Sequence, residues 1–187
     1  MLLGQIHLTL PFWLQQMELE QARYTDHTAQ MQLAVELARL NVERGSGGPF
    51  GAAVFTSDGR LVGVGVNRVI QMNCSLAHAE IMAIMTAQQR LQCYRLNQLN
   101  ELSFVLASSA QPCCQCYGAS IWAGIDTLLI GARAEDVEAL SGFDEGPLPD
   151  DWRGELERRG ITVHHDLLRQ EACGVLRDYA ARNGPTY

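Results

Sequence analysis

The feature that most constrains the fold of this chain is a run of thiols, QPCCQC, at residues 111–116. Proline is favoured at the start of a helix, so Pro112 predicts that a helix begins here. Cys113 and Cys116 then lie three residues apart on one face of its first turn, at the positive helix end, which favours thiolates. The fold must bury these sulfurs or give them a common partner.

Three interpretations of the thiols compete. A disulfide is disfavoured, because residues this close in sequence cannot bridge without strain and we expect a reducing compartment. Burial as core filler is common for free cysteine, and a C-x-x-C pair alone does not separate it from metal binding. We expect Cys114 to point away from Cys113 and Cys116 and to serve only in packing.

A second motif, AHAE at residues 77–80, favours the metal. His78 also opens a predicted helix, and one imidazole with two thiolates makes a three-ligand zinc site whose fourth position stays open for water. Glu80 lies within reach of that water and is suited to proton transfer. H-x-E followed by P-C-x-x-C is the signature of zinc deaminases.

The hydrophobic periodicity predicts an alternation of helices and strands. Helices are expected at 28–43, 78–90, 113–123 and 166–182, and strands at 50–56, 61–66, 103–108, 127–132 and 161–164. Ser57 to Arg60 form a hairpin turn, residues 67–77 a polar loop, and residues 141–155 a Gly-, Pro- and Asp-rich excursion. This order implies an α/β fold whose mixed sheet is covered by helices on both faces.

Composition limits the classes of partner. A chain of 187 residues with a net charge of −7 and no lysine lacks the clustered cations of a nucleic-acid surface. The apolar start, MLLGQIHLTLPFWL, has no basic residue and is interrupted by polar residues, so we expect a packed segment rather than a signal peptide. No run reaches membrane-span length, and we expect a cytoplasmic protein.

Residues 28–132, with "GGPFGA", "HAE" and "PCCQC", resemble the cytidine deaminase superfamily. "DVEALSGFDEGP" (136–147), "LERRGITV" (156–163) and the ending "NGPTY" are similar to bacterial guanine deaminases of the domain-swapped dimer type. The resemblance implies a three-layer α/β/α fold with a mixed five-stranded sheet. It also implies a catalytic domain (28–165) and a C-terminal segment (166–187) exchanged between subunits. The N-terminal extension (1–27) departs from this family pattern, and we expect it to pack on the domain or a partner.

The same resemblance implies roles for individual residues. His78, Cys113 and Cys116 would bind one Zn²⁺ per subunit, and Glu80 would shuttle protons, with Glu145 favoured as a second shuttle. The substrate would be contacted by a further set: Asn67, the backbone N–H of Ala79, Phe50, Trp122, Phe143, Asp144 and Tyr187, the last closing the partner's site.

The implied reaction is hydrolysis of guanine to xanthine and ammonia by a homodimer acting on a free base. An aminotriazine such as ammeline, or cytosine, has a similar reactive edge and stays open as a substrate. A tRNA adenosine deaminase shares both motifs but would need a basic surface. A non-catalytic zinc-stabilised module would need neither Glu80 nor an open ligand position.

Overall fold

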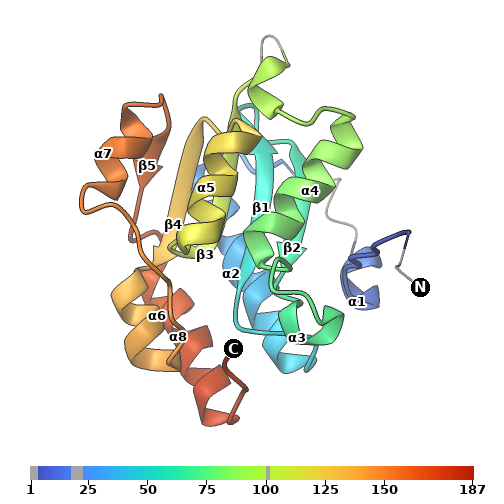
Figure 1. The fold of residues 1–187 in the computed structure, drawn as a ribbon, viewed down its shortest axis with the longest axis vertical. Coiled ribbons are helices and arrows are strands. Elements are labelled where there is room, and N and C mark those ends of the chain that lie inside the picture. Colours follow the sequence, from blue (N-terminus) through green and yellow to red (C-terminus); the bar gives the residue numbers. More distant parts are fainter. Residues whose placement is uncertain (1–3, 18–22, 100–101) are drawn as a thin grey trace.

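The fold is built on one mixed sheet, as a computed structural model covering residues 4–17, 23–99 and 102–187 shows (Figure 1). Its five strands have the order β2-β1-β3-β4-β5. β1 is antiparallel to both β2 and β3, whereas β3, β4 and β5 are parallel. The strand bounds are Gly51–Thr56 (β1), Leu61–Val66 (β2), Phe104–Ala110 (β3), Thr127–Ala132 (β4) and Thr162–His164 (β5). The expected mixed five-stranded sheet is thus confirmed.

Helices cover both faces of the sheet and complete three layers. One layer contains α2 (His27–Glu43), α6 (Ala134–Ser141) and α8 (Arg169–Ala181). The other contains α4 (Ala79–Leu91), α5 (Cys114–Ala123) and α7 (Trp152–Glu157). Short turns of helix, α1 (Phe12–Gln15), α3 (Val69–Met72) and η2 (Leu96–Gln98), lie in the connections. None of the helices described is long and apolar enough to cross a membrane.

The core follows from alternation along the central strands. In β1, Ala53 and Phe55 face the layer of α2, whereas Ala52 and Val54 face that of α4. Successive side chains of a strand point to opposite faces, so a central strand covered on both sides is apolar throughout. All six residues of β1 are buried, as are all seven of β3.

Four of the described α-helices lie where none was expected. α1 falls within the N-terminal segment, α3 within the expected polar loop 67–77, and α7 begins near the end of the expected excursion 141–155. α7 begins where Asp151 accepts a hydrogen bond from the backbone N–H of Gly154. α6 begins where Asp136 accepts from the backbone N–H of Arg133. Such short helices are defined by their caps and contacts rather than by periodicity, which explains why the hydrophobic pattern did not indicate them.

The described part of the N-terminal extension packs on its own domain. Leu14 is buried among the residues of the α2 layer. The indole N–H of Trp13 donates to Ser46 Oγ at 3.0 Å, and the Arg44 guanidinium lies over the same ring. Residues 1–3 and 18–22 of this extension lie outside the described residues. Packing therefore connects the extension to the loop that follows α2.

Helix α4 lies unusually close to β2, because glycines form the contact. A Cβ added at Gly65 would lie 2.1 Å from the carbonyl oxygen of Ala79, and one at Gly63 would lie 2.3 Å from that of Ala83. Both oxygens belong to helix backbone, so neither can swing aside. The glycines set the depth at which the start of α4, with His78 as its N-cap, sits on the sheet.

We expect Gly65→Ala to destabilise the protein by about 1–3 kcal/mol or more, the range for overpacking a core. Chemical denaturation measures the change. Gly118→Ala is the matched control, since no atom beyond its own stretch of helix lies within 4 Å of its added Cβ and alanine is the better helix former. Equal stability of the two variants would contradict the close-packing argument.

Candidate active site

A cavity of about 380 Å³ opens where α4 and α5 begin. This volume lies within the range typical of small-molecule sites. The residues that line it come from α3, the end of β3 and the first turns of α4 and α5, from the loops after α2, β2, α3, β3 and α6, and from the C-terminal tail. They are Phe50, Asn67, Val69, Ser75, His78, Glu80, Ala110, Gln111, Cys113, Cys114, Gln115, Phe143, Asp144, Glu145, Gly146 and Tyr187.

The three expected ligand residues meet beside this cavity. One ligand atom each from His78, Cys113 and Cys116 lies within 4.8 Å of the others. Cys113 Sγ is 3.5 Å from His78 Nδ1. Tetrahedral zinc, with bonds of about 2.0–2.3 Å, separates its ligands by roughly 3.5–3.8 Å. One imidazole and two thiols are also donors that zinc prefers, so these residues fit the metal.

The local fold explains why the ligands converge. His78 is the N-cap of α4 and Cys113 is the N-cap of α5, so both extended residues lie at the positive ends of helices. A hydrogen bond from Cys116 lowers the pKa of Cys113 to about 4. That same bond, together with burial, raises the pKa of Cys116. Two clustered sulfurs that cannot both ionise alone are suited to a shared cation.

Glu80 lies on the first turn of α4 with its carboxyl group turned inward. It is 6% exposed. Oε1 accepts a hydrogen bond from Ser108 Oγ at 3.2 Å, and Oε2 accepts from Cys116 Sγ at 3.3 Å. Burial, followed by the charge of Cys113, raises the pKa of Glu80 above its ordinary value. A buried carboxyl group with a raised pKa is suited both to take and to return a proton.

Aromatic side chains form one side of the cavity. Phe143 packs edge-on against Phe50, with ring centroids 5.1 Å apart, and against Tyr187, at 5.0 Å. The Tyr187 ring also lies 6.4 Å from that of His78. Tyr187 therefore reaches the cavity of its own chain. The exchange of residues 166–187 between subunits stays a prediction.

Asn67 is a buried polar residue of the cavity, 1% exposed. Its side-chain oxygen accepts from the backbone N–H of Val69, and its side chain hydrogen-bonds with the Tyr187 hydroxyl. Ala79, also buried, is the first residue of α4. The first N–H groups of a helix have no partner inside it, which suits Ala79 to the expected backbone contact.

Glu145 is the second buried acid of the cavity, 7% exposed. Burial, reinforced by the charges of Glu80 and Cys113, raises its pKa to about 8. Its backbone oxygen accepts from the N–H of Cys114 at 3.0 Å, which ties this loop to α5. The neighbouring Asp144 lines the cavity but is exposed, and its Oδ1 accepts from the N–H of Gly146.

Two sequence-based expectations differ from the structure. Trp122 does not line this cavity; it is 76% exposed, and it lines a separate groove with residues of α4. The apolar sequence of α5 gave no indication of which face would turn outward. Cys114 is not buried packing either. It is exposed and lines the cavity, facing Gly146.

Sequence reasoning missed two supporting residues. Ser108 hydrogen-bonds to Glu80. The sequence feature that could have indicated this role is a hydroxyl inside the apolar strand FVLASSA. Asn41 is fully buried, and its amide donates to the backbone oxygens of Gly48 and Asn67. The sequence feature that could have indicated Asn41 is a polar residue on the apolar face of α2. Ser46 links Asn41 to Trp13, so the N-terminal segment supports the loop beside Asn67.

Comparisons with known proteins agree with this geometry. The family profile of the cytidine and deoxycytidylate deaminase zinc-binding region matches residues 24–132. The guanine deaminase of Bacillus subtilis is 38% identical over 145 residues, covering 78% of this chain and 88% of the relative. The tRNA-specific adenosine deaminase of Buchnera aphidicola (from Schizaphis graminum) is 30% identical over 149 residues, covering 80% and 90%.

The solved structure of the guanine deaminase from Nitrosomonas europaea has a TM-score of 0.91 and 44% identity, covering 97% of this chain and 99% of its own. The profile spans more than half of the chain, and the relatives align over most of their length. The chain therefore belongs to the cytidine and deoxycytidylate deaminase family of zinc-binding proteins.

Proposed function

We propose that this chain is a zinc-dependent hydrolase that converts guanine and water into xanthine and ammonia. The observation that carries the proposal is one cavity in which the zinc-type donor set adjoins two buried acids, Glu80 and Glu145, and aromatic walls. The guanine deaminases of Bacillus subtilis and Nitrosomonas europaea support guanine as the base. The similar protein NE0047 has been solved with 2,6-diaminopurine bound.

His78, Cys113 and Cys116 would hold the zinc ion. Zinc bound in such a site lowers the pKa of a coordinated water to about 7, which supplies a hydroxide nucleophile at neutral pH. Glu80 would accept one proton of the attacking water and deliver it to the purine ring nitrogen while the water oxygen bonds to the carbon that carries the exocyclic amine. Glu80 would then move the remaining proton of that oxygen to the amine, so that the C–N bond breaks, ammonia leaves and the C=O bond of xanthine forms.

The remaining cavity residues orient the base. Phe50 and Phe143 pack against its faces, Asn67 and the Ala79 N–H hydrogen-bond its ring, and Glu145 contacts the purine edge. Glu145 holds a proton at neutral pH because its pKa is raised to about 8, so it can donate to an acceptor on that edge. A site built from hydrogen bonds rejects bases that lack the matching groups.

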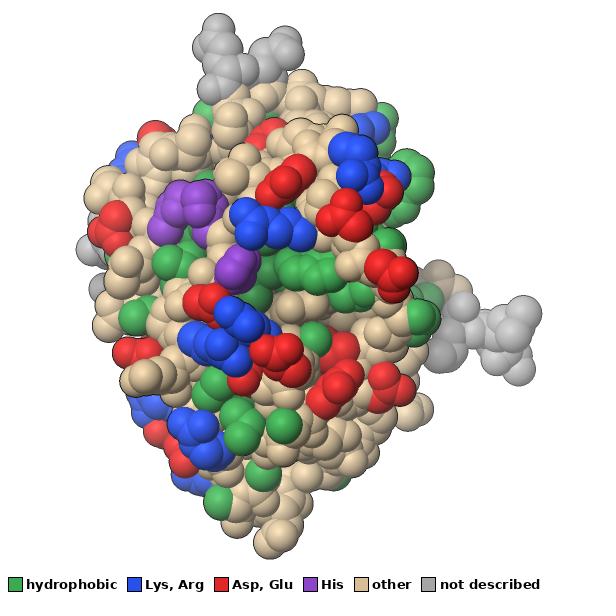
Figure 2. Space-filling view, turned by 90° about the vertical axis from the view of Figure 1, so that its left-hand side faces the viewer, with side chains coloured by type: hydrophobic (Ala, Val, Ile, Leu, Met, Phe, Trp, Pro, Cys, Tyr) green, Lys and Arg blue, Asp and Glu red, His purple; other side chains and the backbone are tan. Residues whose placement is uncertain are grey.

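A free base fits the surface of the chain better than an RNA. The net charge is −7 and lysine is absent. On the face formed by α6, α7, α8 and β5, arginines and acids are interspersed rather than segregated (Figure 2). Phosphate backbones need concentrated positive charge. Gel-shift measurements with tRNA at moderate salt distinguish the two activities, and tight binding would favour the RNA substrate.

The test is ammonia release from guanine, adenine, cytosine, cytidine and ammeline, with zinc content measured alongside. We expect guanine to be the best substrate. We expect Glu80→Gln to lose activity by about 10²–10⁴-fold, the usual contribution of a general acid–base, while it retains zinc.

Glu171→Gln is the control for this substitution, since Glu171 is an exposed acid of α8 outside the cavity. Full turnover by the zinc-loaded Glu80→Gln protein would exclude the proposed proton transfer. If ammeline were the one compound to release ammonia, the substrate would be ammeline and not guanine.

The raised pKa of Glu145 predicts a pH dependence of stability. The folded protein keeps this proton up to about pH 8, whereas the unfolded chain releases it near the ordinary value of 4.5. The folded state thus binds more protons between these values, and the free energy of unfolding falls as pH rises, by up to about 1.4 kcal/mol per pH unit. The contribution is fully present below about pH 4.5 and is lost through about pH 8.

Denaturant titrations of the metal-free protein across this range measure the slope, because the charge of Cys113 contributes to the raised pKa. Glu145→Gln keeps the shape of the side chain without the titration, so its stability should fall less steeply. Parallel curves for the two proteins would show that Glu145 does not titrate in this way.

The chain is also proposed to form a homodimer through the exposed apolar groove of α4 and α5. Met85, Tyr94 and Trp122, 39%, 76% and 76% exposed, line this groove. Exposed aromatic side chains grouped at one groove are typical of protein interfaces.

Trp122→Glu should convert the dimer to a monomer in light-scattering chromatography, because it places a charge in the wall of the groove. Phe12→Glu is the control at another exposed aromatic. An unchanged dimer would exclude this groove as the interface.

A further inference from the structure

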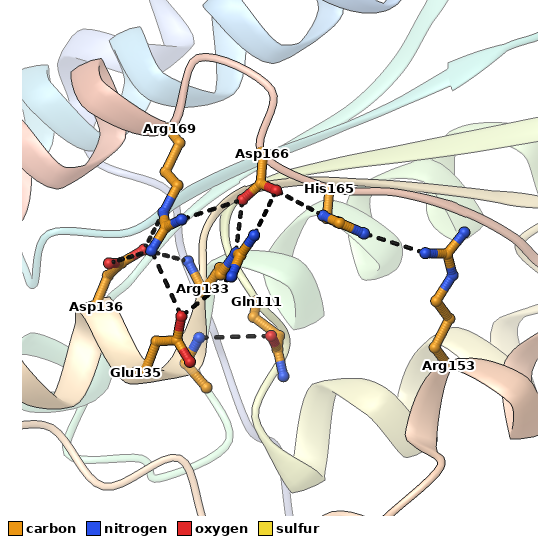
Figure 3. Close-up of polar contacts among 9 residues, drawn as sticks. Gln111, Arg133, Glu135, Asp136, Arg153, His165, Asp166 and Arg169 are labelled. Atoms are coloured by element: carbon orange, nitrogen blue, oxygen red, sulfur yellow. Dashed lines mark hydrogen bonds and ion pairs between the residues drawn. The ribbon is translucent and has the colours of Figure 1, made fainter.

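A cluster of charged side chains joins the beginnings of α6 and α8 (Figure 3). Arg133 donates from Nε and Nη2 to the two oxygens of Asp166, at 2.7 and 2.8 Å. Arg169 donates in the same forked manner to Asp136, at 2.7 and 2.8 Å. Arg169 Nη1 lies 3.6 Å from Asp166 and connects the two pairs. We call these four residues the α6–α8 charge cluster.

The cluster differs from the ordinary ion pairs of a surface. The side chains are 16–40% exposed, and each pair is bidentate, which adds geometric specificity to the attraction. The pairs cross between elements 33 residues apart in the chain. Asp136 also accepts from the backbone N–H of Arg133, so one carboxylate both caps α6 and pairs with Arg169.

The cluster also holds the segment between β5 and α8 in an unfavourable conformation. Asp166 and Leu168 have φ angles of +66° and +51°, a region that residues other than glycine seldom adopt. Such strain persists only where surrounding contacts fix it. Arg133 and His165 both contact the Asp166 carboxylate. The entry of the chain into α8 is therefore set by the cluster.

The segments that follow the C-terminal ends of α6 and α8 form two walls of the cavity. α6 ends at Ser141 and leads directly to Phe143, whereas α8 ends at Ala181 and leads to Tyr187. Phe143 contacts both Tyr179 of α8 and Tyr187, with ring centroids 5.9 and 5.0 Å apart. The distance between these walls thus depends on how α6 lies against α8.

We propose that Arg133, Asp136, Asp166 and Arg169 are positioning residues, which hold α6 against α8 so that Phe143 and Tyr187 close on the base. The inference rests on the proposed function for the identity of that base. The ligand residues and Glu80 lie at the starts of α4 and α5, in the other layer, and Glu145 is tied to α5 through Cys114. Loosening the cluster therefore affects binding of the base more than its conversion.

Asp136→Asn tests this directly. The asparagine oxygen still caps α6, but the charged fork with Arg169 is lost. We expect KM for guanine to rise roughly five- to tenfold while kcat changes by less than about twofold. Arg169→Lys keeps the charge without the fork and should be intermediate. Arg158→Gln is the matched control, because it removes exposed ion pairs of α7 that join no part of the cavity.

A double variant with Tyr187 distinguishes a positioning role of the cluster from a general effect on stability. In a Tyr187→Ala background, Asp136→Asn should raise KM little further, since one of the two positioned walls is already absent. Fully additive effects in the double variant would overturn the inference. So would a lowered melting temperature of Asp136→Asn with KM unchanged.

A second measurement does not depend on the substrate. Hydrogen–deuterium exchange of the free protein should be faster in residues 142–146 and 183–187 of Asp136→Asn, and unchanged around His78. Unchanged exchange in both segments would overturn the inference even if guanine is the substrate. Failure of the wild type to release ammonia from guanine would instead refute the proposed function, and exchange alone would then decide the role of the cluster.

Discussion

Helices α4 and α5 begin side by side on one face of the sheet, and the whole site depends on how closely they lie against it. The glycines of β2 allow α4 to lie backbone to backbone with the strand. That depth brings His78 to within hydrogen-bonding distance of Cys113 and turns Glu80 inward toward Ser108. Binding of a metal and placement of a proton acceptor are thus two results of one packing contact.

Much of this arrangement is encoded locally and is therefore readable from the sequence. Each strand that leads to a ligand helix is apolar, and each helix start is marked by its own residue, Pro112 before one and His78 at the other. The donor set follows from the spacing of Cys113 and Cys116 on a single helical turn. The hairpin is marked in the same way by Gly59, whose φ of +81° a turn glycine permits.

The remaining features depend on contacts between segments distant in sequence. The family resemblance placed Trp122 against the base, yet the direction of its side chain depends on which face of α5 meets the sheet. Cys114 lines the cavity only because the loop containing Gly146 crosses it. The charge cluster joins residues 33 positions apart, with no periodic signal. No window of sequence contains both partners of such contacts.

The positions of the three tryptophans have a practical consequence for spectroscopy. Trp13 lies in the N-terminal segment, Trp122 in the groove of α4 and α5, and Trp152 at the start of α7, so no indole lines the cavity. Intrinsic tryptophan emission therefore has no indole in contact with a bound nucleobase. A shift in its wavelength would instead report changes in solvent around Trp122, the indole that is 76% exposed.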